Sequence, residues 1–483
     1  MKRNISLYSL CLLTAGSSTA SLVAKEKTNV VFILADDLGY GDLSCYGQEK
    51  FQTPNIDELA QRGMRFTQCY SGTTVSAPSR CSLVTGRHTG NACIRGNSSV
   101  NPDYEVALPT GINTIFKIFK EAGYKTGAFG KWGLGEVGST GDPNKQFVDT
   151  FFGYNSQLLA HNYYPDHMWD NDKRVDYPEN ANGAYGTYSQ DEIHKHALKF
   201  IDDNKEEPFF LFIPYVLPHA ELLVPEDSII QKFRGMYPEQ PHHGTDSGPM
   251  FRKGGYCSQV YPHATFAAMV YRYDVYVGQI VAKLKEEGLY DNTLIIFTSD
   301  NGPHREGGAD PEFFNSNGIY RGIKRDLYEG GIRVPMIAAW PGQIEEGTVS
   351  YQPCAFWDMM PTFAELIDTK MTPECDGISI LPTLTGKEKK QKQHDYFYFE
   401  FHEMNGRQAI IKGNWKLLQL DIRKSPRYEL YNIASDPSEI HNMVDRNPEK
   451  FTELKTLMES ARSTDTNWPL LPHEYNNIIE KKH

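Results

Sequence analysis

Apolar residues along this chain gather in short runs that are separated by amphipathic stretches. Runs of consecutive apolar or β-branched residues predict strands buried on both faces, because half-exposed strands would alternate with polar positions. The main predicted strands span residues 28–35, 125–129, 208–216, 293–298 and 334–340. Apolar residues at helical spacing predict helices at 53–63, 114–122, 264–287 and 358–367. Strands and helices that alternate in this way predict an α/β protein.

The last part of the chain has a different pattern. Short predicted strands at 396–401, 408–411 and 415–419 are followed by a predicted helix at 448–461. Several strands followed by a helix are typical of a small α+β domain. We therefore predict a catalytic domain over residues 25–385 and a C-terminal α+β subdomain over residues 386–483, joined near the lysine-rich stretch 387–392.

The first residues resemble an export signal. Lys2 and Arg3 precede an apolar run over residues 7–13, and the sequence Ser-Thr-Ala at 18–20 offers a cleavage site. The run is much shorter than the roughly 20 residues that a membrane span needs, and no later segment is long and apolar enough. We predict a signal peptide over residues 1–20 and a periplasmic or secreted protein.

Composition and charge limit the partners. The chain has a net charge of −12, which argues against a nucleic acid as partner. An anionic substrate would have to be attracted by local positive groups instead. The cysteines after the predicted signal are scattered and contain no CxxC pair, so a zinc site is not indicated.

Two predicted strands end in carboxylates. The strand at 28–35 is followed by Asp36 and Asp37, and the strand at 293–298 is followed by Ser299, Asp300 and Asn301. Ligands bind at the carboxyl ends of strands in open α/β sheets, and adjacent carboxylates repel each other unless a cation lies between them. Ca²⁺ or Mg²⁺ would suit these oxygen ligands. An aspartate that merely ends a strand in a solvated turn is an equally good interpretation.

Three further polar groups follow strands or begin a helix. Lys131 lies in a glycine-rich loop after residues 125–129, where it could bind an anion or be a solvated charge. His219 follows residues 208–216, where it could donate a proton or be a structural histidine. Ser76 precedes a predicted helix, where an N-cap serine is the simplest interpretation and a place for an anion is the other. Arg80 lies one turn later on the same side of that helix.

These residues occur in the order of a known family. The stretch Ser76-x-Pro-Ser-Arg80-x-x-x-x-Thr-Gly resembles the signature of the type I sulfatases. Asp-Asp after the first strand, Gly-Lys-Trp at 130–132, Pro-His at 218–219, Asp-Asn-Gly at 300–302 and Lys-x-x-x-Tyr-Glu-Gly-Gly at 324–331 match the same family in order. The resemblance implies the alkaline-phosphatase-like fold, with a large mixed sheet between helices and a smaller C-terminal domain with an antiparallel sheet.

The resemblance also implies roles. Ser76 would be oxidised to formylglycine by a maturation enzyme that accepts serine, and the hydrated aldehyde would attack sulfur with help from Asp300. One Ca²⁺ ion would be held by the modified Ser76 and by Asp36, Asp37, Asp300 and Asn301. Sulfate would be polarised by Arg80, Lys131 and Lys324. His219 would protonate the departing sugar oxygen.

One position departs from the family pattern. The pattern commonly reads Gly-Lys-Trp-His-Leu-Gly, but here the histidine position is Gly133. In the family that histidine contacts the formylglycine and is linked to sulfate release. His161 and His304 are the candidates to fill its space from other loops.

The predicted substrate is a sulfated carbohydrate. Residues 140–188 read as one long loop with aromatic and hydrogen-bonding side chains, which suit a sugar and suit a self-packed loop nearly as well. The predicted substrate-binding residues are His161, His304, Arg305, Glu306 and Arg95. The loop around His161 resembles that of bacterial sulfatases acting on galactose or N-acetylgalactosamine sulfates of mucins and glycosaminoglycans. The alternatives are a phosphonate or phosphate ester hydrolase of the same superfamily, and a sulfated-glycan-binding protein with Ser76 unmodified.

Overall fold

A computed structural model describes residues 27–99, 106–370 and 374–475. The predicted export signal, residues 1–20, lies outside these ranges. Within them, no helix combines the length and the apolar character that crossing a membrane requires.

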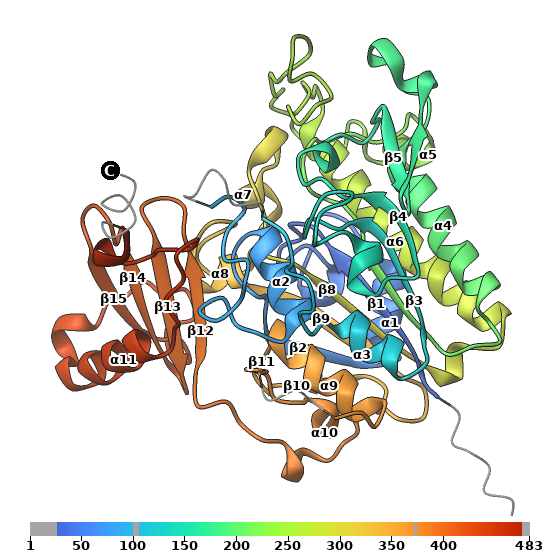
Figure 1. The fold of residues 1–483 in the computed structure, drawn as a ribbon. Coiled ribbons are helices and arrows are strands. Elements are labelled where there is room, and N and C mark those ends of the chain that lie inside the picture. The colour runs from blue at the N-terminus through green and yellow to red at the C-terminus, as the bar shows by residue number, and fades with distance from the viewer. Residues whose placement is uncertain (1–26, 100–105, 371–373, 476–483) are drawn as a thin grey trace, which may run out of the picture.

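The larger part of the protein is built around one mixed sheet (Figure 1). Its strands lie in the order β10-β2-β9-β8-β1-β7-β3-β4-β5-β6, and the short β11 pairs with β2. β1 pairs in parallel with β7 and β8, β3 pairs in parallel with β7 and β4, and β9 is antiparallel to its neighbours. The strands are β1 Asn29–Ala35, β2 Met64–Tyr70, β3 Lys125–Lys131, β4 Thr150–Tyr154, β5 His167–Asp170, β6 Lys173–Asp176, β7 Phe209–Pro214, β8 Thr293–Ser299, β9 Arg333–Ala339, β10 Thr348–Ser350 and β11 Cys354–Ala355.

Helices cover both faces of this sheet. They are α1 Pro54–Gln61, α2 Ser76–Thr85, α3 Ile115–Glu121, α4 Ser189–Asp203, α5 Ser228–Phe233, α6 Pro262–Glu286, α7 Pro311–Phe314, α8 Glu329–Ile332, α9 Met359–Leu366 and α10 Leu381–Leu384. In β1, Val31 and Ile33 pack with residues of α1, α4, α5 and α6, whereas Val30 and Phe32 pack with residues of α2, α3 and α9. The two-residue side-chain period of a strand thus supplies two separate cores, which is why β1 is apolar from residue 30 to residue 35.

The main predicted strands and helices are confirmed, and one prediction is wrong. Residues 140–188 do not form one irregular loop, because β4, β5 and β6 lie within them. Two further elements were not predicted from the sequence. They are β2, in which polar and apolar residues alternate, and the amphipathic helix α4. β5 and β6 form a short antiparallel pair at the end of the sheet, and most side chains of β6 are exposed, so they carry little hydrophobic signal.

The C-terminal part forms a second sheet of antiparallel strands, shown in orange and red beside the large sheet in Figure 1. Its elements are β12 Phe397–Phe401, β13 Arg407–Lys412, β14 Trp415–Leu420, β15 Arg427–Asn432 and the helix α11 Pro448–Ser460. One face packs against α11 through Leu454 and Met458. The other face packs against Tyr70, Val75 and Trp357 of the larger part. The two parts therefore share a hydrophobic contact.

A buried ion cluster joins the same two parts. Lys416 of β14 places its Nζ 2.9 Å from Glu329 Oε1 and 3.0 Å from Glu439 Oε1, and all three side chains are fully buried. Burial, opposed by Lys416, raises the pKa of Glu439 to about 7. Glu329 also accepts hydrogen bonds from Tyr70 and Arg333. Lys416 is thus the cation that lets two carboxylates remain buried side by side.

We predict that Lys416→Met lowers the free energy of unfolding by about 3–5 kcal/mol, because it leaves buried carboxylates without their shared cation. Chemical denaturation measures the loss. Lys412→Met is the matched control, because Lys412 lies on β13 of the same sheet and pairs with Glu453 at the surface. Its unfolding free energy should stay close to that of the parent protein, and equal losses in the two variants would contradict the prediction.

Candidate active site

The predicted site residues meet at one edge of the large sheet. β1, β7 and β8 run in parallel, so the residues that follow them lie together: Asp36 and Asp37, His219, and Asp300 and Asn301. β3 continues the parallel set and ends at Lys131. Asp37 has φ 64°, a left-handed conformation that turns the chain sharply at the end of β1. The arrangement follows the general rule for ligand sites in open α/β sheets.

Ser76 does not cap α2. It is the first residue of the helix, and Val75 occupies the N-cap position without a side-chain hydrogen bond. The Ser76 hydroxyl instead lies 2.8 Å from Asp36 Oδ1 and 2.7 Å from Asp300 Oδ2. Ser76 is buried, and Lys131 Nζ lies 3.4 Å from its Oγ. The N-cap interpretation is therefore wrong, because the serine points away from its own helix into a cluster of charges.

Arg80 links the residues of this cluster by hydrogen bonds. Its side chain is 1% exposed, and its Nε and Nη2 lie 3.1 and 2.9 Å from the same Asp300 oxygen. Its Nη1 donates to the Lys131 carbonyl at 2.8 Å. Ser79, one position earlier, donates to the Asp300 carbonyl at 2.6 Å. The first turns of α2 thus hold the end of β8 and the end of β3 at once.

Two lysines complete the cluster. Lys131 Nζ lies 2.6 Å from Asp36 Oδ2, and Lys324 Nζ lies 2.7 Å from Asp37 Oδ2. Three carboxylates, Asp36, Asp37 and Asp300, therefore face three cationic groups, and the cluster is close to neutral as it stands. A divalent cation added to it would leave an excess of positive charge at this edge, where an anion could bind even though the whole chain is acidic.

The pKa shifts in the cluster reflect this crowding. Burial alone would raise the pKa of Asp36, but Lys131, His219 and Arg80 together hold it well below its usual range. Burial and then the charge of Asp36 raise the pKa of Asp300 to about 7. The pKa values of these neighbouring carboxylates shift in opposite directions because Asp36 and Asp300 repel each other and share the same cations.

The residues fit a divalent cation held by oxygen atoms. Asn301 donates through its Nδ2 to Asp37 at 2.7 Å, while its buried Oδ1 finds no partner among the described residues. That oxygen, the carboxylates of Asp36, Asp37 and Asp300, and the Ser76 hydroxyl form the kind of hard donor set that Ca²⁺ prefers. One oxygen each of Asp36 and Asp37 and a nitrogen of His219 lie within 4.8 Å of one another.

His219 lies at the other side of Lys324. Its Nδ1 is 2.5 Å from the Ala220 carbonyl, and because a carbonyl only accepts, Nδ1 carries the proton. Its Nε2 lies 3.1 Å from Lys324 Nζ. Burial and then Lys324 lower the pKa of His219 well below its usual range, so the ring is neutral at pH 7. The Nε2 atom therefore accepts a hydrogen bond from Lys324.

His161 and His304 do not lie at Gly133, contrary to our expectation. Their rings stack on His219, with ring centres 5.0 and 5.6 Å away. Gln157 occupies the space beside Gly133, because a Cβ at position 133 would lie 3.0 Å from Gln157 Nε2. Burial and then Lys131 lower the pKa of His161 to about 4. No sequence motif marked Gln157 as a neighbour of this site; it reaches Gly133 from the turn after β4.

The other predicted substrate-binding residues are spread more widely. Glu306 contacts His304 at 3.2 Å, and it also pairs with Arg325. Arg305 is exposed and pairs with Glu312. The structure does not bring Arg95 to the cluster. Arg95 is 2% exposed, and it donates to the carbonyl and hydroxyl of Ser463 in the C-terminal part.

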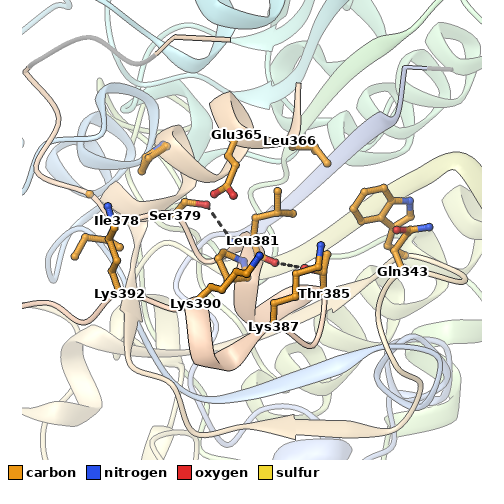
Figure 2. A pocket seen from close by; sticks show the side chains of 14 residues that line it. Gln343, Glu365, Leu366, Ile378, Ser379, Leu381, Thr385, Lys387, Lys390 and Lys392 are labelled. Carbon is orange, nitrogen blue, oxygen red and sulfur yellow. Dashed lines mark hydrogen bonds between the residues drawn. The ribbon is translucent and has the colours of Figure 1, made fainter. Parts of the chain in front are cut away.

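A larger cavity lies elsewhere. It measures about 680 Å³ and is bordered by Trp340, α9, α10 and the lysine-rich stretch (Figure 2). Trp340 follows β9, which is antiparallel to β8, so this cavity is at the opposite edge of the large sheet from Asp300. Volume alone would have misplaced the active site.

Comparison with known proteins identifies the family. The family model for sulfatases matches residues 28–369, and the model for the C-terminal part of N-sulphoglucosamine sulphohydrolase matches residues 318–464. The chain belongs to the sulfatase family. This sulfatase is 30% identical to an N-acetylgalactosamine-6-O-sulfatase of Bacteroides thetaiotaomicron, with 91% of this chain and 94% of the relative covered. It is also 30% identical to human arylsulfatase A, with 91% and 88% covered. The protein is a sulfuric ester hydrolase.

Solved structures agree with the alkaline-phosphatase-like fold. The crystal structure of Ps i-CgsB in complex with k-i-k-neocarrahexaose superposes with a TM-score of 0.77 at 29% identity, covering 95% of this sulfatase and 97% of that chain. A phosphonate monoester hydrolase of Agrobacterium radiobacter has the same fold, with a TM-score of 0.63, 21% identity, and 90% and 95% covered. The predicted fold, a large mixed sheet with a smaller antiparallel sheet, is confirmed.

We predict that Arg80→Lys lowers kcat/KM of this sulfatase on an aryl sulfate by about 100-fold. A lysine keeps the charge but cannot hold Asp300 and the Lys131 carbonyl together, as the arginine fork does. Steady-state kinetics measures the change. The control is Arg87→Lys just beyond the same helix, where a partly exposed arginine contacts Glu374 and Asp376, and where kcat/KM should change by no more than about twofold.

Proposed function

We propose that this sulfatase removes sulfate from a carbohydrate, a galactose or N-acetylgalactosamine sulfate of mucin or glycosaminoglycan glycans. The observation that carries the proposal is the position of Ser76. Its hydroxyl lies between two carboxylates, within reach of Lys131, and at the sheet edge where Lys324 and His219 also meet. An unmodified serine in this place is a poor nucleophile, because a serine hydroxyl keeps its proton at neutral pH and, among the described residues, no histidine hydrogen-bonds to it.

Two groups that the chain would acquire complete the site. Formylglycine made from Ser76 would supply the attacking hydroxyl, and Ca²⁺ held by Asp36, Asp37, Asp300, Asn301 and residue 76 would supply a positive charge that no side chain can match. The buried Asn301 oxygen, which has no partner among the described residues, supports the ion.

Side chains of this sulfatase would bind the sulfate and transfer the protons. Arg80, Lys131 and Lys324 surround residue 76 with fixed positive groups, which would orient the sulfate and stabilise charge that develops on its oxygens. Their burial makes these interactions strong, because little water competes for them. Asp300, whose Oδ2 lies 2.7 Å from the Ser76 hydroxyl, would take or share the proton of the attacking hydroxyl.

Protonation of the leaving oxygen would use two residues together. His219 is neutral and carries its proton on Nδ1, so it has no proton to give from Nε2 until it receives one. Lys324 lies 3.1 Å from that nitrogen, and its carboxylate neighbours, against the effect of burial, raise its pKa, so it would keep its proton and polarise the sugar oxygen by hydrogen bonding. His219, protonated from solvent, would deliver the proton to that oxygen as the S–O bond breaks. The sequence assigned this step to His219 alone.

Other observations support the proposed substrate class and the proposed cellular location. The relatives include N-acetylgalactosamine-6-sulfatases of Bacteroides thetaiotaomicron and of mammals, and the neighbouring structure Ps i-CgsB holds a neocarrahexaose. We propose export to the periplasm or the medium, and maturation by an enzyme that oxidises serine, because the signature here has Ser76 rather than cysteine.

The deciding experiment is mass spectrometry of the Ser76 peptide from protein made in its native host. We expect the aldehyde at position 76, together with hydrolysis of 4-nitrophenyl sulfate that is much faster than hydrolysis of 4-nitrophenyl phosphate. Serine in every copy would favour a sulfated-glycan-binding protein instead. An aldehyde with a preference for the phosphate would favour a phosphate or phosphonate ester hydrolase.

We predict that Ca²⁺ raises the melting temperature of chelator-treated protein, because it relieves the repulsion among Asp36, Asp37 and Asp300. Differential scanning fluorimetry measures the shift, and it can use the unmodified serine form. In Asp37→Asn the shift should shrink. Asp57→Asn is the control, because Asp57 lies in α1 and contacts Ser44 and Cys45 rather than the cluster. A full shift in Asp37→Asn would refute this ion site.

We predict that His161→Ala and His304→Ala each slow turnover of an activated aryl sulfate, by roughly tenfold, because both rings pack against His219 and hold it near Lys324. The pH profile of kcat separates this positioning role from simple destabilisation, since a loosened His219 should titrate at a higher pH. Unchanged rates in both variants would show that His219 is held without them.

A further inference from the structure

The cavity of about 680 Å³ at the opposite sheet edge is separate from the catalytic cluster (Figure 2). Strand β8 lies between the two places, because Asp300 follows its last residue and the cavity lies at the edge where β8 begins. The seven residues of β8 span about 23 Å, at about 3.3 Å for each residue. A single sugar therefore cannot occupy both places, whereas a chain of several sugars could reach from one to the other.

The cavity carries positive charge in a protein that is acidic as a whole. Its lining contains three lysines, Lys387, Lys390 and Lys392, and one carboxylate, Glu365, whereas the chain has a net charge of −12. Figure 2 shows the lysines on one side of the cavity and Glu365 of α9 on the other. Among the described residues, no carboxylate forms an ion pair with any of these lysines. Their charges are therefore available to attract an anion.

The stretch that carries the lysines is held in place by hydrogen bonds. Gln391, in the middle of this stretch, accepts a hydrogen bond from Thr383 Oγ1 at 2.7 Å and donates to the Ser379 carbonyl at 2.9 Å. The backbone N–H of Lys387 donates to the Pro382 carbonyl at 2.7 Å. These contacts tie the stretch to α10 and to the residues before α10. The lysines thus extend from fixed backbone positions, which reduces the entropy lost when a ligand binds.

The remaining lining suits a sugar. Trp340, Leu381 and Pro382 contribute apolar groups, and Gln343 and Thr385 contribute an amide and a hydroxyl. A sugar ring presents both C–H groups and hydroxyls, so it can use both kinds of side chain. The volume of the cavity lies within the range of about 300–1,000 Å³ that is typical of small-molecule sites.

We propose that this cavity is a second, non-catalytic site that binds an anionic segment of a glycan chain. The choice of a glycan rests on the proposed function. Sulfate or carboxylate groups of the chain would pair with the three lysines, and a sugar ring would contact the apolar and polar side chains of the lining. An anionic membrane surface would also attract lysines, but a flat surface cannot enter a concave cavity.

Such a site would hold a long substrate on the protein while another part of the same chain reaches the catalytic edge. Binding at two places on one chain raises the effective concentration of the second segment, so affinity increases without any new contact at residue 76. Short substrates such as an aryl sulfate would gain nothing from it.

Binding to the unmodified serine form tests the site without turnover. Isothermal titration calorimetry would use hexasaccharides of chondroitin sulfate and of hyaluronan, with 4-nitrophenyl sulfate in excess to occupy the catalytic edge. Both hexasaccharides carry carboxylates, and only the first carries sulfate. We expect the chondroitin sulfate hexasaccharide to bind at least about tenfold more weakly to the triple variant Lys387→Gln, Lys390→Gln and Lys392→Gln. The same loss with hyaluronan would identify carboxylates as the groups bound, and a loss confined to chondroitin sulfate would identify sulfates. Equal affinities of the parent protein and the triple variant for chondroitin sulfate would overturn the proposal.

Two controls separate a site from a general attraction between lysines and a polyanion. The triple variant Lys412→Gln, Lys424→Gln and Lys450→Gln removes the same charge from the C-terminal part and should change the affinity by no more than about twofold. Lys389→Gln should also have little effect, because Lys389 belongs to the same stretch but does not line the cavity. Equal losses in the two triple variants would overturn the proposal. So would binding of the parent protein to phosphatidylglycerol vesicles but to neither hexasaccharide, which would favour a membrane surface.

Kinetics separates this inference from the proposed function. In the aldehyde form, the cavity variant should hydrolyse 4-nitrophenyl sulfate with kcat/KM within about twofold of the parent value, because the lysines are remote from residue 76. Hydrolysis of this ester by the parent protein, without any effect of the three lysines on hexasaccharide binding, would leave the sulfatase intact and remove the role of the cavity. Hexasaccharide binding that depends on the lysines, without hydrolysis of any sulfate ester, would remove the proposed function and support the role of the cavity.

Discussion

The structure of this sulfatase is organised around the difficulty of burying several carboxylates at one place. Parallel strands deliver Asp36, Asp37 and Asp300 to the same edge of the sheet, away from bulk water. Bringing such charges together is costly unless cations accompany them. Arg80 and the two lysines come from a helix, a strand end and a distant loop, so the fold must close before the charges are balanced. The same balance makes the site ready for an anion once a further cation binds.

Sequence patterns predicted the frame of the molecule well, and the reason is physical. β1, β7 and β8 are apolar on both faces because helices cover both faces, so their signal is strong and local. β2 and β6 were missed because their polar residues face partly outward. The signature around Ser76 predicted the site's members through family resemblance, whereas local sequence alone favoured an N-cap, because the contacts of Ser76 come from residues 40 and 224 positions away.

Geometry that depends on side-chain orientation could not be predicted from sequence. His161 and His304 were the candidates to fill the space at Gly133 from other loops, but the structure stacks both rings on His219. Gln157 and Asn155 carry no motif, and only the pairing of β3 with β4 brings them beside Gly133. Arg95 was likewise predicted to bind substrate, but its side chain donates to Ser463 of the C-terminal part instead.

The residue at position 133 is tied to the neighbouring strand end. Trp132 and Gly133 donate backbone hydrogen bonds to Tyr154 and Asn155, so the ends of β3 and β4 are tied together. A change at position 133 therefore alters the space available to the turn after β4. A Cβ at position 133 would lie 3.0 Å from Gln157 Nε2, so a larger residue there would require Gln157 to move. Because β3 ends at Lys131, one charge of the catalytic cluster and the turn after β4 depend on the same pair of strands.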